Sequence, residues 1–175
     1  MDIIPDDHGN LRFLDVPEAF FQQLLSLPTA CDPSGSASIE QRLYPAPVPE
    51  PASLDDLEIN DDWDNYVKPD LEEGNRQAIE TVLDDLDCAQ STPDDEGSNW
   101  YEFEVPAVHM THWHQAINLA RLVMAGKYRL PLTEFPMEEG EKLSLERLFA
   151  AHLCDRYAEI GEVFVHQMMQ EFDDQ

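Results

Sequence analysis

The chain has 175 residues, of which 42% are hydrophobic, so it can build one core and full disorder is not expected. Its 37 Asp and Glu residues outnumber its 10 Lys and Arg residues, which gives a formal net charge of −27. This charge excludes a general binder of nucleic acid or anionic membranes, because the phosphate groups of either partner would be repelled.

The three cysteines, Cys31, Cys88 and Cys154, are widely spaced and odd in number, which favours reduced thiols in the cytoplasm. No apolar run approaches the length of about 18 residues that a membrane span needs. The acidic N-terminus also lacks the layout of a signal peptide. We therefore expect a cytoplasmic protein with no membrane attachment, whose residues 1–175 form a single helical domain.

The first elements predicted along the chain are a hairpin and a helix. Two apolar segments, 3–4 and 11–14, flank the turn-forming residues 7–10, which is typical of a β-hairpin. Pro17 suits the first position of a helix, and apolar residues at helical spacing follow it until Pro28 ends the pattern.

Residues 28–58 are rich in proline and serine and predict a mobile segment with one or two helical turns near 38–43. The following region, 50–104, carries 19 acidic residues against only Lys68 and Arg76. Apolar residues recur there at helical spacing, which predicts a helix near 69–87. Glu80, Asp84 and Asp85 are placed off its buried stripe, so we expect them on an acidic, exposed face.

The C-terminal half has the most regular patterns. A polar loop is predicted at 91–99, and alternation over 100–105 predicts a half-buried strand that could pair with the hairpin. A helix should run from Pro106 to about residue 127, followed by a connector at 129–140. A last helix should begin after Ser144, a plausible N-cap, and end near residue 172, with Phe149, Leu153 and Tyr157 on its buried line.

These elements predict a mainly α fold: four to five helices in a bundle-like domain with a small N-terminal β element. Trp113 lies at the middle of the most regular helix, with small residues along its face. We expect it to be deeply buried against the last helix near 149–157.

Three histidines, His109, His112 and His114, lie within six residues and suggest a metal site, because imidazole is a good ligand for zinc or nickel. On a helix only His109 and His112 share a face, so at most two can join one site. The alternative, which we favour, is that one of these two is packed and hydrogen-bonded. We expect no metal and no other cofactor.

Arg121 is one of few basic side chains. It could bind a ligand, or it could form a bidentate ion pair with a carboxylate of the acidic helix; we favour the ion pair. The sequence contains no GxSxG, P-loop or GxGxxG pattern. We therefore expect no enzymatic activity and no catalytic residues.

Several short motifs resemble one family. They are Arg42-Leu43-Tyr44-Pro45 after the first helix, Asp70-Leu71 at the start of an amphipathic helix, and Trp113 followed by Asn118 and Arg121-Leu122. The family consists of small helical proteins without an assigned function, mainly actinobacterial and often encoded beside the Clp-protease adaptor ClpS. The resemblance spans about residues 11–169, implies a similar fold and transfers no catalytic residue. The chain departs from the family pattern at residues 124–130.

Our main functional hypothesis is a non-enzymatic interaction or regulatory protein that binds a basic protein surface. An acidic nucleic-acid mimic that occupies a DNA- or RNA-binding protein is the first alternative, and a histidine-based metalloprotein is the second. In both interaction hypotheses the chain contacts no nucleic acid itself. The candidate interaction residues are Trp63, Tyr66, Asp84, Asp85, Trp100 and Arg121.

Overall fold

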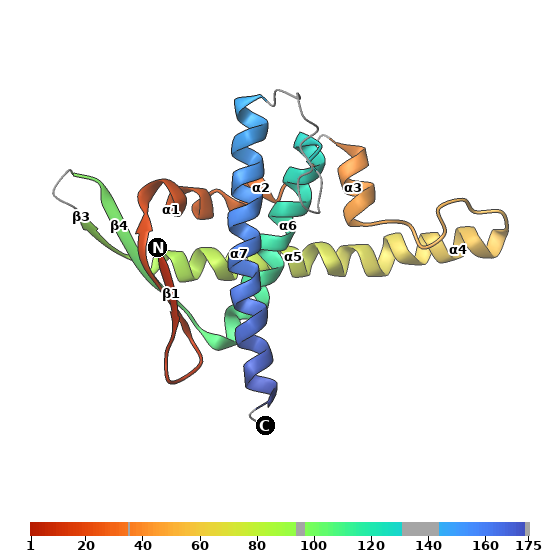
Figure 1. Cartoon of the computed structure of the whole chain (residues 1–175). Helices are drawn as coiled ribbons and strands as arrows, with labels where there is room; N and C mark the ends of the chain where they lie inside the picture. The colour runs from red at the N-terminus through yellow and green to blue at the C-terminus, as the bar shows by residue number, and fades with distance from the viewer. Residues whose placement is uncertain (35, 94–96, 131–143, 174–175) are drawn as a thin grey trace.

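The computed structural model describes residues 1–34, 36–93, 97–130 and 144–173, with side chains up to Gln170 in the last helix. The N-terminal hairpin supplies strands β1 (Asp2–Pro5) and β2 (Leu11–Pro17) of a four-stranded antiparallel sheet (Figure 1). Strand β4 (Asn99–Val105) pairs with β2, and β3 (Gln90–Pro93) forms the far edge, in the order β1-β2-β4-β3. The predicted hairpin and its pairing with the 100–105 strand are confirmed.

The described helices include two short ones, α1 (Glu18–Leu25) and α2 (Leu27–Ala30), followed by α3 (Ala37–Leu43). The next segment is one continuous helical path made of α4 (Leu54–Asp62), a π-helical turn η1 (Trp63–Val67) and α5 (Lys68–Asp87). A 3-10 turn η2 (Ala107–His109) leads into α6 (Met110–Tyr128), and α7 (Leu145–Asp173) packs antiparallel along it. Counting the continuous path once, the described residues form six helices, more than the four or five expected.

The core is centred on Trp113, which is fully buried as predicted. Its ring stacks on Phe13 and Phe103, which face each other across β2 and β4, at centroid distances of 5.9 and 5.6 Å. Phe164 of α7 packs against the same indole at a centroid distance of 5.9 Å. The core thus lies between the sheet, α5, α6 and α7. Aromatic pairs at these distances stabilise the fold by more than their buried area alone would give.

The expected contact of Trp113 with the 149–157 part of α7 is wrong. Phe149 is 56% exposed, and Tyr157 packs on Phe20 of α1 while its hydroxyl donates to the carbonyl of Gln23. Helix α7 runs antiparallel along α6, from Ala150 beside Ala125 to Met168 beside Thr111, so the part of it level with the indole contains Phe164 (Figure 1). Periodicity predicted the apolar line of α7 but not its register against α6.

Segment 28–58, predicted as a loop, contains α3, as expected near 38–43, but also part of α2 and the first turn of α4. Helix α4 begins there because Ser53 and Asp56 form a capping box, each side chain accepting from the other's backbone N–H. The polar 91–99 segment likewise begins as β3 rather than as a loop. Ser144 caps α7 as predicted, while most of the 129–140 connector lies outside the described residues.

Helix α3 lies close to α6 because Gly126 has no side chain. A Cβ atom on this glycine would come within 2.8 Å of Cγ1 of Ile39, which is buried in α3. The glycine therefore permits a close approach that a larger residue would prevent. This contact holds α3, and with it Tyr44, above α5.

Candidate interaction surface

The most unusual surface is the acidic arm, which we define as residues 54–73: α4, η1 and the first turns of α5. The arm contains nine carboxylates and a single basic residue, Lys68. No residue of α4 or η1 is buried. Figure 1 shows α4 at the far end of the rod that continues α5, on the opposite side of the molecule from the sheet. The arm is therefore an extension of a core helix that projects from the body.

Apolar side chains of the arm are open to solvent. Leu54 is 83% exposed and Tyr66 is 69% exposed, and Leu57, Ile59 and Leu71 are also exposed. A fold that needed the arm only for solubility would not require apolar groups among its carboxylates. The π-helical turn occurs within this stretch, and such turns are frequent at functional sites. The arm therefore offers both negative charge and apolar contact area.

The proline-rich segment that precedes the arm folds back onto it. The amide of Asn60 imitates a backbone partner: its Oδ1 accepts from Val48 N at 3.1 Å and its Nδ2 donates to Val48 O at 2.9 Å. Trp63 is half-buried, and among the described residues its buried Nε1 has no hydrogen-bond partner. These contacts brace the arm along part of its length.

The only basic residue of the arm, Lys68, forms an ion pair with the body of the protein. The Nζ atom of Lys68 lies 2.8 Å from a carboxylate oxygen of Glu40 in α3 and 3.9 Å from Glu72. The hydrogen bond to Glu40 raises the pKa of Lys68. The amine also lies 5.8 Å from the centre of the Tyr44 ring. Lys68 therefore ties the arm to α3 and leaves the remaining carboxylates of the arm in excess.

The predicted interaction residues do not form one site. Trp63 and Tyr66 belong to the arm, whereas Trp100 belongs to β4, at the opposite end of the molecule (Figure 1). Asp84 is exposed on α5 as predicted. Only the arm residues therefore share a surface.

The expectation that Asp85 lies on the exposed face is wrong. The residue is 8% exposed, and its Oδ2 accepts a 2.8 Å hydrogen bond from Nε1 of Trp113. Nδ1 of His109 lies 2.9 Å from Oδ1 of the same carboxylate. The sequence held a signal, because Asp85 follows the buried Ala78 by seven residues, a core spacing on a helix. Asp85 thus joins α5 to α6 and is not an interaction residue.

Arg121 also differs from expectation. Within the described part of the chain it forms no ion pair with a carboxylate of α5, and its buried Nε atom has no hydrogen-bond partner. Its side chain is half-buried on α6. Arg121 therefore does not hold the two helices together through a fork onto α5.

The three histidines of α6 and the preceding turn lie against different helices. His109 faces Asp85, and Nδ1 of His112 lies 3.4 Å from Oγ1 of Thr81, so both lie against α5 as their spacing predicts. His114 lies beside Gly161 of α7 instead. Over the ranges that the structure describes, no group of three or more His, Cys, Asp or Glu side chains is arranged to hold a metal.

Fold and surface together define a small, mainly α protein with an antiparallel sheet and a projecting acidic helix. The chain belongs to the family described as Domain of unknown function (DUF2017), which matches residues 12–166 and so includes the arm as well as the core. This confirms the resemblance at the level of a family without an assigned function. Among curated proteins and solved structures, none matches the chain at a significant level. No helix in the described ranges has the length and apolarity to cross a bilayer.

Proposed function

We propose that the protein is a non-enzymatic interaction or regulatory protein whose acidic arm binds a basic surface of a partner protein. The observation that carries this proposal is the joint exposure of apolar side chains and carboxylates on a helix that projects from the core. Carboxylates would steer a basic partner toward the arm, and the apolar groups would then be buried in the contact.

The negative charge also limits the alternatives. Two copies of the arm would repel each other, because each carries nine carboxylates and one amine. Anionic partners such as nucleic acids or phospholipid surfaces are disfavoured for the same reason. A basic protein surface, by contrast, would be attracted by the carboxylates of the arm and would bury its exposed apolar side chains.

An acidic nucleic-acid mimic is a second candidate, supported by the spacing of the charges. Asp55 and Glu73 are separated by about 27 Å at 1.5 Å per residue, and nine carboxylates lie in that interval. This is one charge per roughly 3 Å, close to the spacing of about 3.4 Å along one strand of DNA. In this reading the basic partner is itself a nucleic-acid-binding protein.

The test compares two charge-neutralising triple variants in pull-downs from the source organism, with mass spectrometry. One variant changes exposed arm residues, Asp61→Asn, Asp62→Asn and Asp64→Asn. The matched control removes three exposed carboxylates of α7, Glu146→Gln, Asp155→Asn and Glu162→Gln. We expect a basic partner that is captured at about 50 mM salt and lost at about 500 mM, because screening weakens the attraction.

Loss of that partner in the arm variant, with retention in the α7 variant, supports the proposal. Equal capture by both variants contradicts it. Addition of double-stranded DNA separates the two candidates: competition for the captured partner supports the mimic, and unchanged capture supports the general interaction protein.

A further inference from the structure

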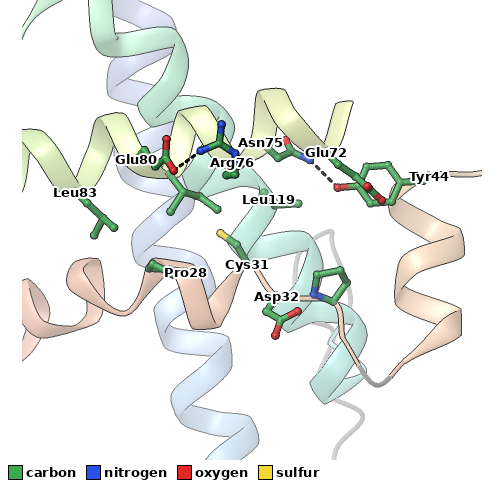
Figure 2. A pocket seen from close by; sticks show the side chains of 12 residues that line it. Pro28, Cys31, Asp32, Tyr44, Glu72, Asn75, Arg76, Glu80, Leu83 and Leu119 are labelled. Carbon is green, nitrogen blue, oxygen red and sulfur yellow. Dashed lines mark hydrogen bonds and ion pairs between the residues drawn. The ribbon is translucent and has the colours of Figure 1, made fainter. Parts of the chain in front are cut away.

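A groove with a volume of about 480 Å³ runs between α5 and the segment that contains α2 and Tyr44 (Figure 2). Its apolar lining includes Pro28, Cys31, Ile79, Leu83 and Leu119. Leu119 and Cys31 are buried beneath it, whereas Ile79 and Leu83 are half-buried and reach solvent through it. The volume lies within the range of small binding pockets, so the groove can take up an apolar side chain.

One end of the groove is built by a chain of hydrogen bonds. Nε2 of Gln115 donates to Oδ1 of Asn75 at 2.9 Å, and Nδ2 of Asn75 donates to the hydroxyl oxygen of Tyr44 at 2.9 Å. Because the Tyr44 oxygen accepts this bond, its own proton is free to be donated elsewhere. Figure 2 shows Tyr44 and Asn75 together at this end. A backbone carbonyl of a bound peptide would match that donor.

The rim of the groove is acidic. Asp32, Glu72 and Glu80 border it, and the only basic residue of the lining, Arg76, is engaged by Glu73 and Glu80. The hydrogen bonds that Arg76 donates to Glu73 and Glu80 raise its pKa. Arg76 therefore does not offer a free positive charge, and the rim favours a cationic occupant.

The groove is continuous with the acidic arm, because both are formed by one helix. Glu72 borders the groove and also belongs to the arm, and Leu71 is exposed beside it. From Leu57 to Ile79 the helical path covers about 33 Å at 1.5 Å per residue. A peptide segment of moderate length would therefore contact the arm and the groove together.

We propose that this groove receives an apolar side chain of a cationic, amphipathic peptide segment, the same partner segment that binds the acidic arm. This inference rests on the proposed function and specifies it. The arm supplies attraction through charge, the apolar lining selects a leucine-sized side chain, and the Tyr44 hydroxyl holds the peptide backbone.

The test uses two synthetic fluorescein-labelled peptides of about 20 residues as probes. One has Lys and Leu at amphipathic helical spacing, and the other has the same Lys residues with Ser in place of Leu. Binding is measured by fluorescence anisotropy at about 50 mM salt. We expect the wild type to bind the Leu peptide about tenfold more tightly than the Ser peptide, because only the former fills the groove.

Ile79→Lys tests the groove, because it places a long cationic side chain inside the lining. We expect it to remove the preference for the Leu peptide. Val108→Lys is the matched control: it adds the same charge at a residue of η2 that is 81% exposed and does not line the groove. It should leave the preference between the two peptides unchanged. Tyr44→Phe, which keeps the ring, should weaken the binding of both peptides.

A measurement on the unmodified protein keeps the proposal testable if Ile79→Lys does not fold. In ¹H–¹³C spectra, the Leu peptide should shift the methyl signals of Ile79, Leu83 and Leu119, and the Ser peptide should not. Equal affinity for the two peptides, or shifts elsewhere only, overturns the groove while leaving the arm proposal intact. Absence of binding by both peptides counts against both proposals. Closure of the groove by a second copy, seen as self-association without peptide, also overturns this inference.

Discussion

The indole nitrogen of Trp113 donates a 2.8 Å hydrogen bond to the carboxylate of Asp85, inside the core of the protein. A buried carboxylate is costly unless its oxygens have partners, and here His109 lies at 2.9 Å on the other oxygen. The pair joins α5, which carries the acidic arm, to α6, which stacks on the sheet through the Trp113 ring. This contact therefore helps to fix the orientation of α5, together with the buried side chains of that helix.

We predict that Asp85→Ala lowers the free energy of unfolding by about 1–3 kcal/mol, because it leaves the buried Trp113 nitrogen without an acceptor. Asp84→Ala is the control, since its side chain is exposed at the preceding position of the same helix, and it should change stability by less than about 0.5 kcal/mol. Urea denaturation followed by circular dichroism measures both. Equal losses would show that the hydrogen bond does not stabilise the fold.

A variant that retains only Trp113, with Trp63→Phe and Trp100→Phe, should emit blue-shifted fluorescence and resist quenching by acrylamide. The reason is the complete burial of Trp113 among aromatic rings. The substitution Trp113→Ala should lower the free energy of unfolding by about 3–5 kcal/mol, as for other buried aromatic residues. Red-shifted, easily quenched emission from the folded variant would contradict the position of this side chain.

The three thiols should react at different rates. Burial raises the pKa of Cys31 to about 12 and that of Cys154 to about 11, whereas Cys88 is exposed. Because the thiolate is the reactive form, Cys88 should react rapidly with a disulfide reagent at about pH 8, the half-buried Cys154 slowly, and Cys31 only after denaturation. Cys88→Ser should remove the rapid phase. Two or more rapid thiols in the folded protein would be inconsistent with this prediction.

The net charge of −27 should make stability depend on salt. We expect the melting temperature to rise between low salt and about 0.5 M NaCl, because salt screens the repulsion among carboxylates. The affinity for the basic peptides should instead fall as the salt concentration rises. Differential scanning calorimetry measures the first effect, and an unchanged melting temperature would mean that the carboxylates are paired or dispersed well enough to avoid repulsion.

Glu73 should contribute to stability only above acidic pH. A hydrogen bond from Arg76, followed by one from Gln77, lowers its pKa from 4.5 to about 2. A lowered pKa in the folded state stabilises the protein above the unfolded value, and this contribution is lost as the pH falls from about 4.5 to about 2. The difference in melting temperature between wild type and Glu73→Gln should therefore be small but present at about pH 6 and largely lost at about pH 2. In an Arg76→Gln background the same comparison should show a smaller pH dependence, because only the hydrogen bond from Gln77 remains.

Local patterns were enough to predict much of the fold. Alternation predicted the half-buried strand at 100–105, helical spacing placed Trp113 on the buried side of α6, and the capping residue Ser144 marked the start of α7. Each of these features depends on residues a few positions apart. The start of α4 at Ser53 was missed because prolines on its N-terminal side outweighed the capping box in the pattern.

The sequence by itself determined that the chain has a mainly α core, a sheet built on the N-terminal hairpin, and an acidic region with apolar residues inside it. Only the tertiary structure decided that Asp85 is buried, that Phe149 is exposed, and that the groove lies between α5 and the chain around α2. Periodicity reports which side chains of a helix share a face, whereas burial depends on which distant segment covers that face. That covering arises from long-range contacts, such as Ile39 beside Gly126 or Phe164 against Trp113, and their positions along the helices are set by how whole elements pack together.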